Sequence, residues 1–410
     1  MSNRDNYLEE AIELASQEKN ILFQWPTGFG KSRCALEIAK KYIYDTNLFP
    51  DILIVVPKLV LIDNWKDEIR KWLGSEELDA FTFTTYVSLY KHMNKHWDMV
   101  IFDECHHFTE KCMSEFQVKL ADRIIALSAT VRSDIRKRLY ASIPNLKYHR
   151  ISMRRAIEEQ VLPDPTVFLI PLELKDVKGT FTYVKNPKGT GTFKVGYQGR
   201  IPYMRRKERL EIICTAVQMY LMFSADVTYW ENRFKKTQYP WEKGKWMHYA
   251  GERLKWLSAI KTELMKGILL QLENCRTLTF CSTIEQADAL GRNTIHSKTR
   301  EGKGNLQRFN EGIEKHITSV NMLNEGMNLA SCQVGVFAGL TASETAQLQK
   351  LGRILRHEKP LIILPYFVNT RDEEIVNGMK LNYNPELIKV VQSKDINTEI
   401  KKFLGNETDN

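Results

Sequence analysis

A glycine-rich segment near the amino terminus constrains this chain more than any other feature. Residues Pro26-Thr27-Gly28-Phe29-Gly30-Lys31-Ser32 follow the apolar run from Ile21 to Trp25 and precede a segment with helical periodicity. A loop of this kind between a strand and a helix wraps backbone N–H groups around phosphate oxygens, places the lysine at the β- and γ-phosphates and offers the serine hydroxyl to Mg²⁺. Trp25 stands where the strict form of the motif has a glycine. The remaining residues of the motif nevertheless predict a nucleoside triphosphate site.

Two shorter motifs follow, each at the end of an apolar run that is typical of a strand. Asp103-Glu104-Cys105-His106 comes after the run from Asp98 to Phe102, and Ser128-Ala129-Thr130 comes after the run from Ile124 to Leu127. A carboxylate at a strand end, such as Asp103, can ligate Mg²⁺, and the next carboxylate, Glu104, can take a proton from an attacking water. An ordinary acidic pair and a helix cap are the alternative interpretations of these residues.

A fourth motif lies far downstream, where Gln349 to Arg356 spells Q-x-x-G-R-x-x-R. Arg353 and Arg356 are three residues apart, so on a helix they share one face and can reach a single phosphoryl group. A salt-bridged helix face would explain the arginines alone. It would not explain four such motifs in this order, which together predict one site that binds and hydrolyses a nucleoside triphosphate.

The order and spelling of these motifs resemble the superfamily 2 DExH-box helicases and translocases, and the resemblance extends over residues 4–370. Weaker motifs of that family have counterparts at Val55-Val56-Pro57, Thr85-Tyr86, Phe280-Cys281-Ser282-Thr283 and Asn324-Glu325-Gly326. The ending Gly352-Arg353-Ile354-Leu355-Arg356 is most similar to the DNA-directed branch that includes RecG, XPB and the phage UvsW-like branched-DNA helicases.

The resemblance implies a role for each motif. ATP and Mg²⁺ would be held by Pro26, Thr27, Gly28, Phe29, Gly30, Lys31, Ser32 and Asp103, with Ser32 and Asp103 as the metal ligands. Catalysis would depend on Lys31, Glu104, Gln349, Arg353 and Arg356, and the coupling of hydrolysis to movement on His106, Ser128 and Thr130. Contacts with nucleic acid are expected at Lys58, Thr85, Thr283 and Gly326.

The hydrophobic pattern predicts an α/β protein with two RecA-like parallel-sheet lobes. Apolar strands alternate with amphipathic helices over residues 1–150 and again over residues 273–383, which is the pattern of parallel sheets. The phosphate loop and the DExH motif lie in the first segment and the arginines in the second, so the site would be complete only when the lobes close. A helical tail is expected over residues 384–410.

Residues 151–272 lie between the two lobes, and the basic part of this segment is expected to bind nucleic acid. Residues 175–261 contain 18 lysines and arginines against 7 aspartates and glutamates, a net charge of +11, whereas the whole chain carries +9. The pattern predicts a hairpin over residues 180–197 and helices from Arg205 to Leu272. Interleaved aromatic residues suit stacking with bases, and phosphate contacts are expected at Arg205, Arg206, Lys207, Lys235 and Lys236. A solvated basic face above core tryptophans is the alternative.

The composition of the chain indicates the cellular compartment in which it works. No apolar run approaches the ~20 residues that a membrane span requires, and seven cysteines without a C-x-x-C pair favour reduced thiols. We therefore expect a soluble, monomeric protein of the cytoplasm, which a phage could encode. Duplex or branched DNA and the proteins of replication, recombination or repair are its expected partners.

Two positions depart from the family pattern. Leu8 stands where many relatives carry a glutamine that reads adenine, and Asn328 stands where many carry an acidic residue. Selectivity for the adenine base is therefore an open question. Two alternative functions also stay open: an RNA helicase with the same core, and a nucleic-acid-binding module that NTP switches without unwinding.

Overall fold

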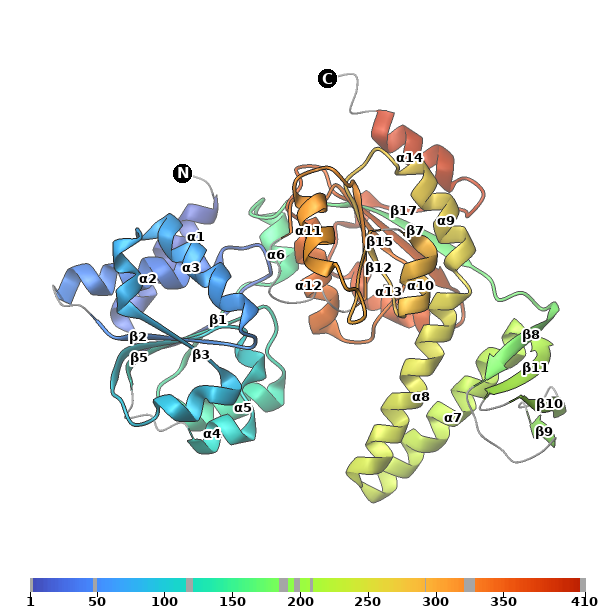
Figure 1. Cartoon of the computed structure of the whole chain (residues 1–410), viewed down its shortest axis with the longest axis horizontal. Helices are drawn as coiled ribbons and strands as arrows, with labels where there is room; N and C mark the ends of the chain where they lie inside the picture. Colours follow the sequence, from blue (N-terminus) through green and yellow to red (C-terminus); the bar gives the residue numbers. More distant parts are fainter. Residues whose placement is uncertain are drawn as a thin grey trace.

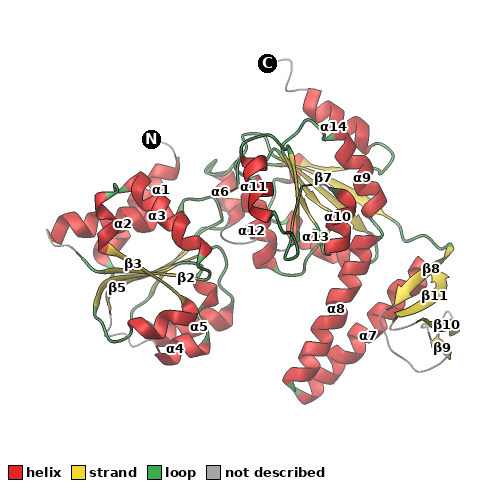
Figure 2. Ribbon diagram, in the orientation of Figure 1, coloured by secondary structure: helices red, strands yellow, loops and turns green. Residues whose placement is uncertain are grey.

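The computed structural model describes residues 3–46, 50–115, 121–183, 191–194, 200–206, 209–291, 293–320 and 329–405. Two α/β lobes lie side by side, and a long arm projects from the second lobe (Figure 1, Figure 2). Among these residues, no helix is long and apolar enough to cross a membrane. The two-lobe architecture predicted from the sequence is thereby confirmed.

Lobe 1 is built on a six-stranded parallel sheet with the order β3-β2-β4-β5-β1-β6. Its strands are β1 (Asn20–Gln24), β2 (Ile52–Val56), β3 (Phe81–Thr85), β4 (Trp97–Phe102), β5 (Ala121–Ser128) and β6 (Lys147–Arg150). One face carries α1 (Asn3–Gln17), α2 (Lys31–Thr46) and α3 (Val60–Trp72), and the other carries α4 (Glu110–Glu115) and α5 (Ser133–Ser142), as Figure 1 shows. Because the strands run parallel, the loops that follow β1, β4 and β5 open at one edge of the sheet, where ligands bind in such folds.

Lobe 2 contains a second parallel sheet, of seven strands in the order β13-β14-β12-β15-β16-β7-β17. The expected segment supplies β12 (Thr277–Phe280), β13 (Thr294–Ile295), β14 (His316–Ser319), β15 (Val334–Phe337) and β16 (Leu361–Phe367). Its helices are α9 (Thr262–Gln271), α10 (Ile284–Leu290), α11 (Gly302–Asn310), α12 (Glu344–Ile354), α13 (Arg371–Lys380) and α14 (Ile396–Gly405). Short 3₁₀ helices lie at Glu76–Ala80, Tyr86–His92, Cys105–His107 and Pro385–Leu387.

Two strands of the second sheet come from outside the segment expected for lobe 2. β7 (Thr166–Leu172) pairs in parallel with the whole of β16, and β17 (Ile388–Val390) pairs with β7. Part of 151–272 and part of 384–410 therefore belong to lobe 2, which corrects the expected boundaries. The physical reason lies in the sequence of β7, since a nearly continuous apolar run is typical of a strand buried on both faces. α6 (Met153–Glu158) and the residues after it connect the two lobes.

The arm comprises residues 178–259 and consists of a small sheet and a helical hairpin. The sheet is antiparallel with the order β8-β11-β10-β9, formed by β8 (Lys178–Tyr183), β9 (Gly191–Lys194), β10 (Arg200–Arg206) and β11 (Arg209–Thr215). The hairpin consists of α7 (Ala216–Thr237) and α8 (Pro240–Ala259). The predicted hairpin over 180–197 is wrong, because β8 pairs with β11 and β9 with β10.

The helical segment of the arm also begins later than predicted. Arg205 and Arg206 belong to β10, and the helix starts only at Ala216. Thr215 and Gln218 form a capping box there, in which each side chain accepts a hydrogen bond from the backbone N–H of the other residue. This reciprocal cap satisfies two backbone donors that a helix start leaves open. Arg205, Arg206 and Arg209–Thr215, for which helices are predicted from the sequence, therefore form strands that pair within the sheet of β8, β11 and β10.

Buried polar contacts fix the root of the arm to lobe 2. Nζ of Lys261 donates to Oδ2 of Asp372 at 2.8 Å, and both side chains are almost fully buried. One residue before α8 ends, the Ser258 hydroxyl donates to Oε1 of Gln286 at 2.7 Å, and Nε2 of Gln286 donates to the Ser258 carbonyl at 2.7 Å. Removing one side of a buried ion pair costs about 3–5 kcal/mol, so Lys261 fixes to lobe 2 the segment that directly follows the arm.

Candidate active site

The phosphate loop is a tight turn between β1 and α2. Gly28 and Gly30 have positive φ angles of 86° and 105°, a conformation that residues with a Cβ adopt only at a cost. Lys31 is buried, and its Nζ donates to the carbonyls of Trp25 at 3.2 Å and Pro26 at 3.4 Å. The loop thus brings a lysine charge to the amino terminus of α2, and this combination binds anionic phosphate.

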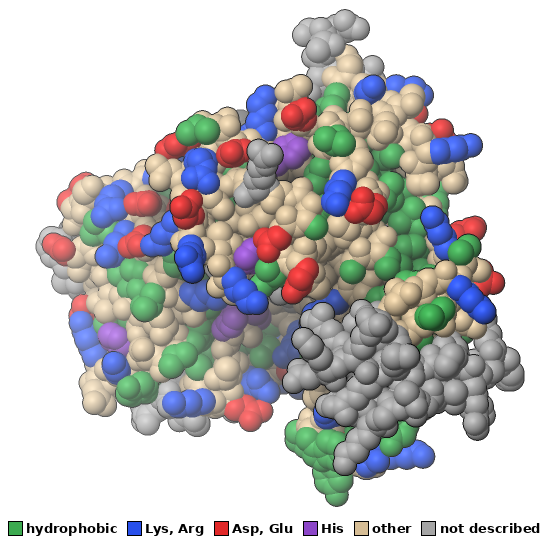
Figure 3. All heavy atoms as spheres, turned by 45° about the vertical axis from the view of Figure 1, so that its right-hand side comes forward, with side chains coloured by type: hydrophobic (Ala, Val, Ile, Leu, Met, Phe, Trp, Pro, Cys, Tyr) green, Lys and Arg blue, Asp and Glu red, His purple; other side chains and the backbone are tan. Residues whose placement is uncertain are grey.

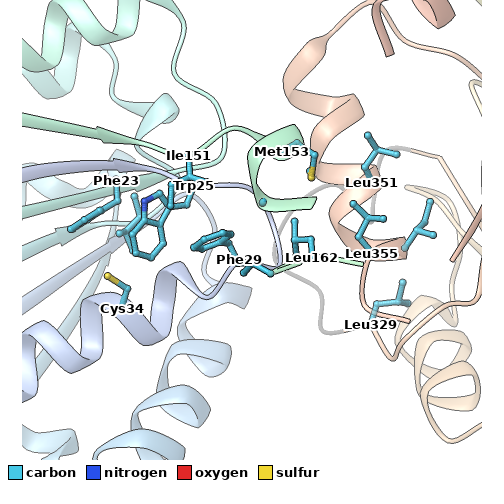
Figure 4. Close-up of a cluster of buried hydrophobic side chains, with 14 of the residues drawn as sticks. Phe23, Trp25, Phe29, Cys34, Ile151, Met153, Leu162, Leu329, Leu351 and Leu355 are labelled. Atoms are coloured by element: carbon cyan, nitrogen blue, oxygen red, sulfur yellow. The ribbon is translucent and has the colours of Figure 1, made fainter. Parts of the chain in front are cut away.

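Trp25, which replaces the first glycine of the strict motif, is part of the hydrophobic core. Its ring packs edge-on against Phe23 and Phe29, and its Nε1 donates to Nδ1 of His149 at 2.8 Å. Figure 4 shows this apolar cluster reaching from Trp25 through Phe29 and Leu162 toward Leu355 in lobe 2. The tryptophan therefore anchors the start of the loop and leaves the turn at the glycines unchanged. The side chain of Phe29 likewise belongs to the core.

Asp103 and Glu104 follow β4 directly. Nε1 of Trp65 donates to Oδ2 of Asp103 at 2.9 Å, and the Tyr86 hydroxyl donates to the Asp103 carbonyl at 2.8 Å. Burial, then the charge of Glu104, raises the pKa of Asp103 to about 6, although the Trp65 hydrogen bond and Lys31 act in the opposite direction. Glu104 has a φ of 47°, a left-handed conformation that costs roughly 1–2 kcal/mol in a non-glycine residue. Strain of this kind clusters at functional sites.

A chain of polar contacts links Glu104 to the Ser-Ala-Thr motif. Nδ1 of His106 lies 3.3 Å from Oε2 of Glu104 and 3.0 Å from Oγ of Ser128. The Ser128 hydroxyl donates to the Thr130 carbonyl at 2.8 Å, so it can accept from the N–H of His106. A change at Glu104 can therefore be transmitted through His106 to the loop that follows β5.

The Q-x-x-G-R-x-x-R motif lies on and just after α12, directly against the phosphate loop. A Cβ built on Gly352 would lie 2.2 Å from Cβ of Thr27, so only glycine fits at this contact between the lobes. α12 ends at Ile354, so Arg356 lies in the following turn and not on the helix face expected for it. Its Nη1 donates to the Leu329 carbonyl at 3.0 Å. Gln349 is buried within α12.

One cavity of about 690 Å³ between the lobes gathers most of the predicted site residues. Lobe 1 contributes Thr27, Gly28, Gly30, Lys31, Ser32, Asp103, Glu104 and one side of α3, and lobe 2 contributes Arg353, Leu355 and Arg356. Pro26, Phe29 and Gln349 are not part of its lining. Motifs that are more than 300 residues apart in the chain therefore meet at one place.

The residues expected to contact nucleic acid are dispersed. Thr283 caps α10, because its hydroxyl accepts from the backbone N–H of Gln286 at 3.1 Å, and Thr85 is buried at the end of β3. Lys58 follows β2, and Lys235 and Lys236 are exposed near the end of α7. Arg205 and Arg206 lie on β10. Lys207 and Gly326 lie outside the described residues.

Several side chains of the cavity were not anticipated from the sequence. α3 lines it mainly with residues spaced three or four apart, and its lining residues are Leu61, Asn64, Trp65, Asp67, Glu68, Lys71 and Trp72. This spacing is the signal of one helix face, and it could have indicated that the face lies beside the phosphate loop. Arg33, two residues after Lys31, and Arg4 of α1 also line the cavity.

Comparisons with known proteins agree with this geometry. Residues 4–133 match the family described as the type III restriction enzyme, res subunit, and residues 260–358 match the helicase conserved C-terminal domain. A curated relative is the DNA 3'-5' translocase XPB2 of Sulfurisphaera tokodaii, which is 24% identical over 371 residues, covering 86% of this chain and 78% of the relative.

Solved helicase structures share the fold. Dbp5 of S. cerevisiae bound to RNA and ADP BeF3 superposes with a TM-score of 0.60 at 13% identity, covering 97% of this chain and 93% of that one. The Hef helicase domain of Pyrococcus furiosus gives a TM-score of 0.51 at 15% identity, covering 92% and 97%. These structures show the fold alone; the two family matches and the curated relative, together with the convergence of the motifs on one cavity, identify the chain as an ATP-hydrolysing member of the superfamily 2 helicases and translocases.

Proposed function

We propose that this superfamily 2 enzyme is a DNA helicase or translocase that couples ATP hydrolysis to movement on duplex or branched DNA. The observation that carries the proposal is the inter-lobe cavity, where the phosphate loop and two carboxylates of lobe 1 face two arginines of lobe 2. A relative named as a DNA 3'-5' translocase supports DNA as the substrate. Work on DNA fits a cytoplasmic monomer that serves replication, recombination or repair.

In the proposed reaction, lobe 1 binds the nucleotide and lobe 2 completes the catalytic site. Glu104 accepts a proton from the attacking water, and Lys31 neutralises charge at the β- and γ-phosphates. Arg353 and Arg356 neutralise the charge that develops on the γ-phosphoryl group, as arginines inserted into such sites do. Gln349 does not line the cavity, so it would act by positioning α12 and not by touching the nucleotide.

The site residues fit a bound Mg²⁺. Asp103 is a buried carboxylate whose pKa is raised by burial and by the adjacent Glu104, and a divalent cation would neutralise this local negative charge. Asp103 and the Ser32 hydroxyl would hold the ion with hard oxygen ligands, which Mg²⁺ prefers. When bound, the ion neutralises phosphate charge in the transition state.

We assign DNA contact to the arm, and in particular to its tip. Residues 231–245 contain five lysines and arginines against two glutamates. Figure 3 shows hydrophobic side chains gathered at the tip with Lys or Arg beside them, and Trp241 is 54% exposed there. Basic groups attract the phosphate backbone, and an exposed aromatic ring can stack on a base.

The other tryptophans of the arm have structural roles. Trp230 packs against Tyr249 with ring centroids 6.4 Å apart, and Trp246 stacks on Phe234 at 6.1 Å, so both join α7 to α8. Trp256 packs on Phe181 and joins the helices to the small sheet. Trp241 also packs edge-on against Trp230, with ring centroids 5.8 Å apart, but it is exposed where the other three are partly buried, and we therefore assign base contact to it.

A strand-displacement assay tests the proposed function. Forked DNA, blunt duplex DNA and an RNA duplex would each be offered with and without ATP. We expect ATP-dependent displacement or translocation on DNA and little on RNA. Efficient unwinding of RNA alone would favour the RNA helicase, and ATP-dependent binding without movement on any substrate would favour the switched binding module.

Replacing Lys235 and Lys236 with glutamine tests the role of the arm. Loss of two phosphate contacts should lower the slope of log affinity against log salt by about one per contact. DNA-stimulated ATPase at limiting DNA should fall more than basal ATPase. Replacing Lys40 and Lys41 on lobe 1 is the matched control, and an equal effect of the two pairs would contradict the assignment.

A further inference from the structure

The cavity extends well beyond the phosphate loop. Trp65 of α3 contacts Asp103 at the phosphate end, and Trp72 lies seven residues later on the same helix face. At 1.5 Å per residue the two positions are about 10 Å apart along α3. A nucleoside triphosphate whose phosphates lie at Lys31 would therefore place its ribose and base toward Trp72.

Three helices of lobe 1 meet at this far end, on the same face of the sheet (Figure 1). Cζ of Arg33, in the first turn of α2, lies 4.3 Å from the centroid of the Trp72 ring. Nη1 of Arg33 also lies 3.4 Å from Oδ1 of Asp5 in α1, and Nε1 of Trp72 donates to Oε2 of Glu68 at 2.8 Å. Two partners thus hold the guanidinium in place at the cavity wall.

We propose that Arg33, supported by Trp72, is the platform on which the nucleotide base stacks. A planar guanidinium stacks on aromatic rings, and an indole behind it fixes its orientation. This proposal rests on the proposed function, in which the cavity holds a nucleoside triphosphate, and it adds where the base lies.

The arrangement also determines which bases the site accepts. Leu8 packs against the hydrophobic core of lobe 1, so at the position where relatives read adenine this chain offers no hydrogen-bonding side chain. Stacking depends on ring area and not on a pattern of donors and acceptors, so it favours purines over pyrimidines without separating adenine from guanine. ATP and GTP should therefore be used similarly, and CTP and UTP less well.

The test measures KM for ATP, GTP, CTP and UTP, together with the affinity for inorganic tripolyphosphate, which has no base. In Arg33→Met and Trp72→Leu, KM for ATP and GTP should rise about tenfold to a hundredfold, which is the range for the loss of one stacked base. Tripolyphosphate affinity should stay within about twofold of wild type, because its contacts are those of the phosphate loop. Trp72→Phe should restore most of the loss, and Lys41→Met on the exposed side of α2 is the control.

Several outcomes would contradict the proposed base platform. The platform is wrong if wild type shows equal KM for purine and pyrimidine nucleotides, if it prefers ATP over GTP a hundredfold, or if neither variant changes KM. A parallel loss of tripolyphosphate affinity would place the effect on the phosphates. Wild type that hydrolyses no nucleotide would instead refute the proposed function, so the two failures are distinguishable.

Discussion

Replacing Gly352 with alanine should uncouple the lobes without damaging either one. The new Cβ would lie 2.2 Å from Cβ of Thr27 and 2.9 Å from its carbonyl oxygen, whereas ordinary contact begins at 3.4 Å. One of the two partners is phosphate-loop backbone, which cannot rotate away as a flexible side chain could. The lobes must therefore separate by roughly 1 Å at this contact, and a misplacement of that size can cost about a hundredfold in rate.

The same substitution should not destabilise lobe 2. Gly352 lies inside α12, where alanine is favoured over glycine by roughly 0.5–1 kcal/mol. Nucleotide binding should also be kept, because the phosphate loop belongs to lobe 1. We therefore expect kcat to fall about a hundredfold while nucleotide affinity changes little.

Steady-state ATPase and nucleotide titration of the full chain provide the measurement. Gly378→Ala in α13 is the control, since a Cβ there would meet nothing within 4 Å. If Gly352→Ala hydrolysed ATP at the wild-type rate, the contact between Thr27 and α12 would not be part of the catalytic arrangement.

Three further predictions follow from the site and from lobe 2. Glu104→Gln should keep nucleotide binding and strongly reduce turnover, whereas Lys31→Ala should weaken both. Nucleotide titration measures the binding, and single-turnover hydrolysis measures the chemical step. Arg353→Ala should lower the ATPase rate by about 10³- to 10⁵-fold with unchanged circular dichroism, and near-normal turnover would contradict its role. Burial lowers the pKa of Lys350 from 10.5 to about 8. Below pH 8 the buried ammonium is charged, which lowers the free energy of unfolding. This penalty disappears above pH 10.5, where the lysine is neutral in the unfolded state too. Lys350→Met should therefore stabilise the protein at pH 7 by at most about 3 kcal/mol, and urea denaturation should show this gain shrinking between pH 8 and pH 10.5.

The catalytic motifs were predictable because each consists of a few consecutive residues whose types indicate their chemistry. The turn at Gly28 and Gly30, the carboxylates after β4 and the arginine motif each carry their own local signal. Their meeting in one cavity followed from the resemblance, since parallel strands place the loops that follow them at one edge.

The remaining features depend on contacts between distant segments, which spacing does not reveal. The clash that only Gly352 avoids involves Thr27, and the environment of Arg33 is assembled from three helices. The helices predicted from Arg205 onward are wrong at β10 and β11, because pairing between strands that are distant in the sequence decided the structure there. β7 was detectable in principle, because its apolar run is characteristic of a central parallel strand.

The rigid root of the arm makes the arm a lever. Its helix α8 has 20 residues and is therefore about 30 Å long, and the ion pair between Lys261 and Asp372, just after this helix, ties its end to lobe 2. If lobe 2 turns by one degree about that end, the tip at Trp241 travels about 0.5 Å, as the length of α8 dictates. A rotation of lobe 2 is therefore carried along α8 to the tip of the arm.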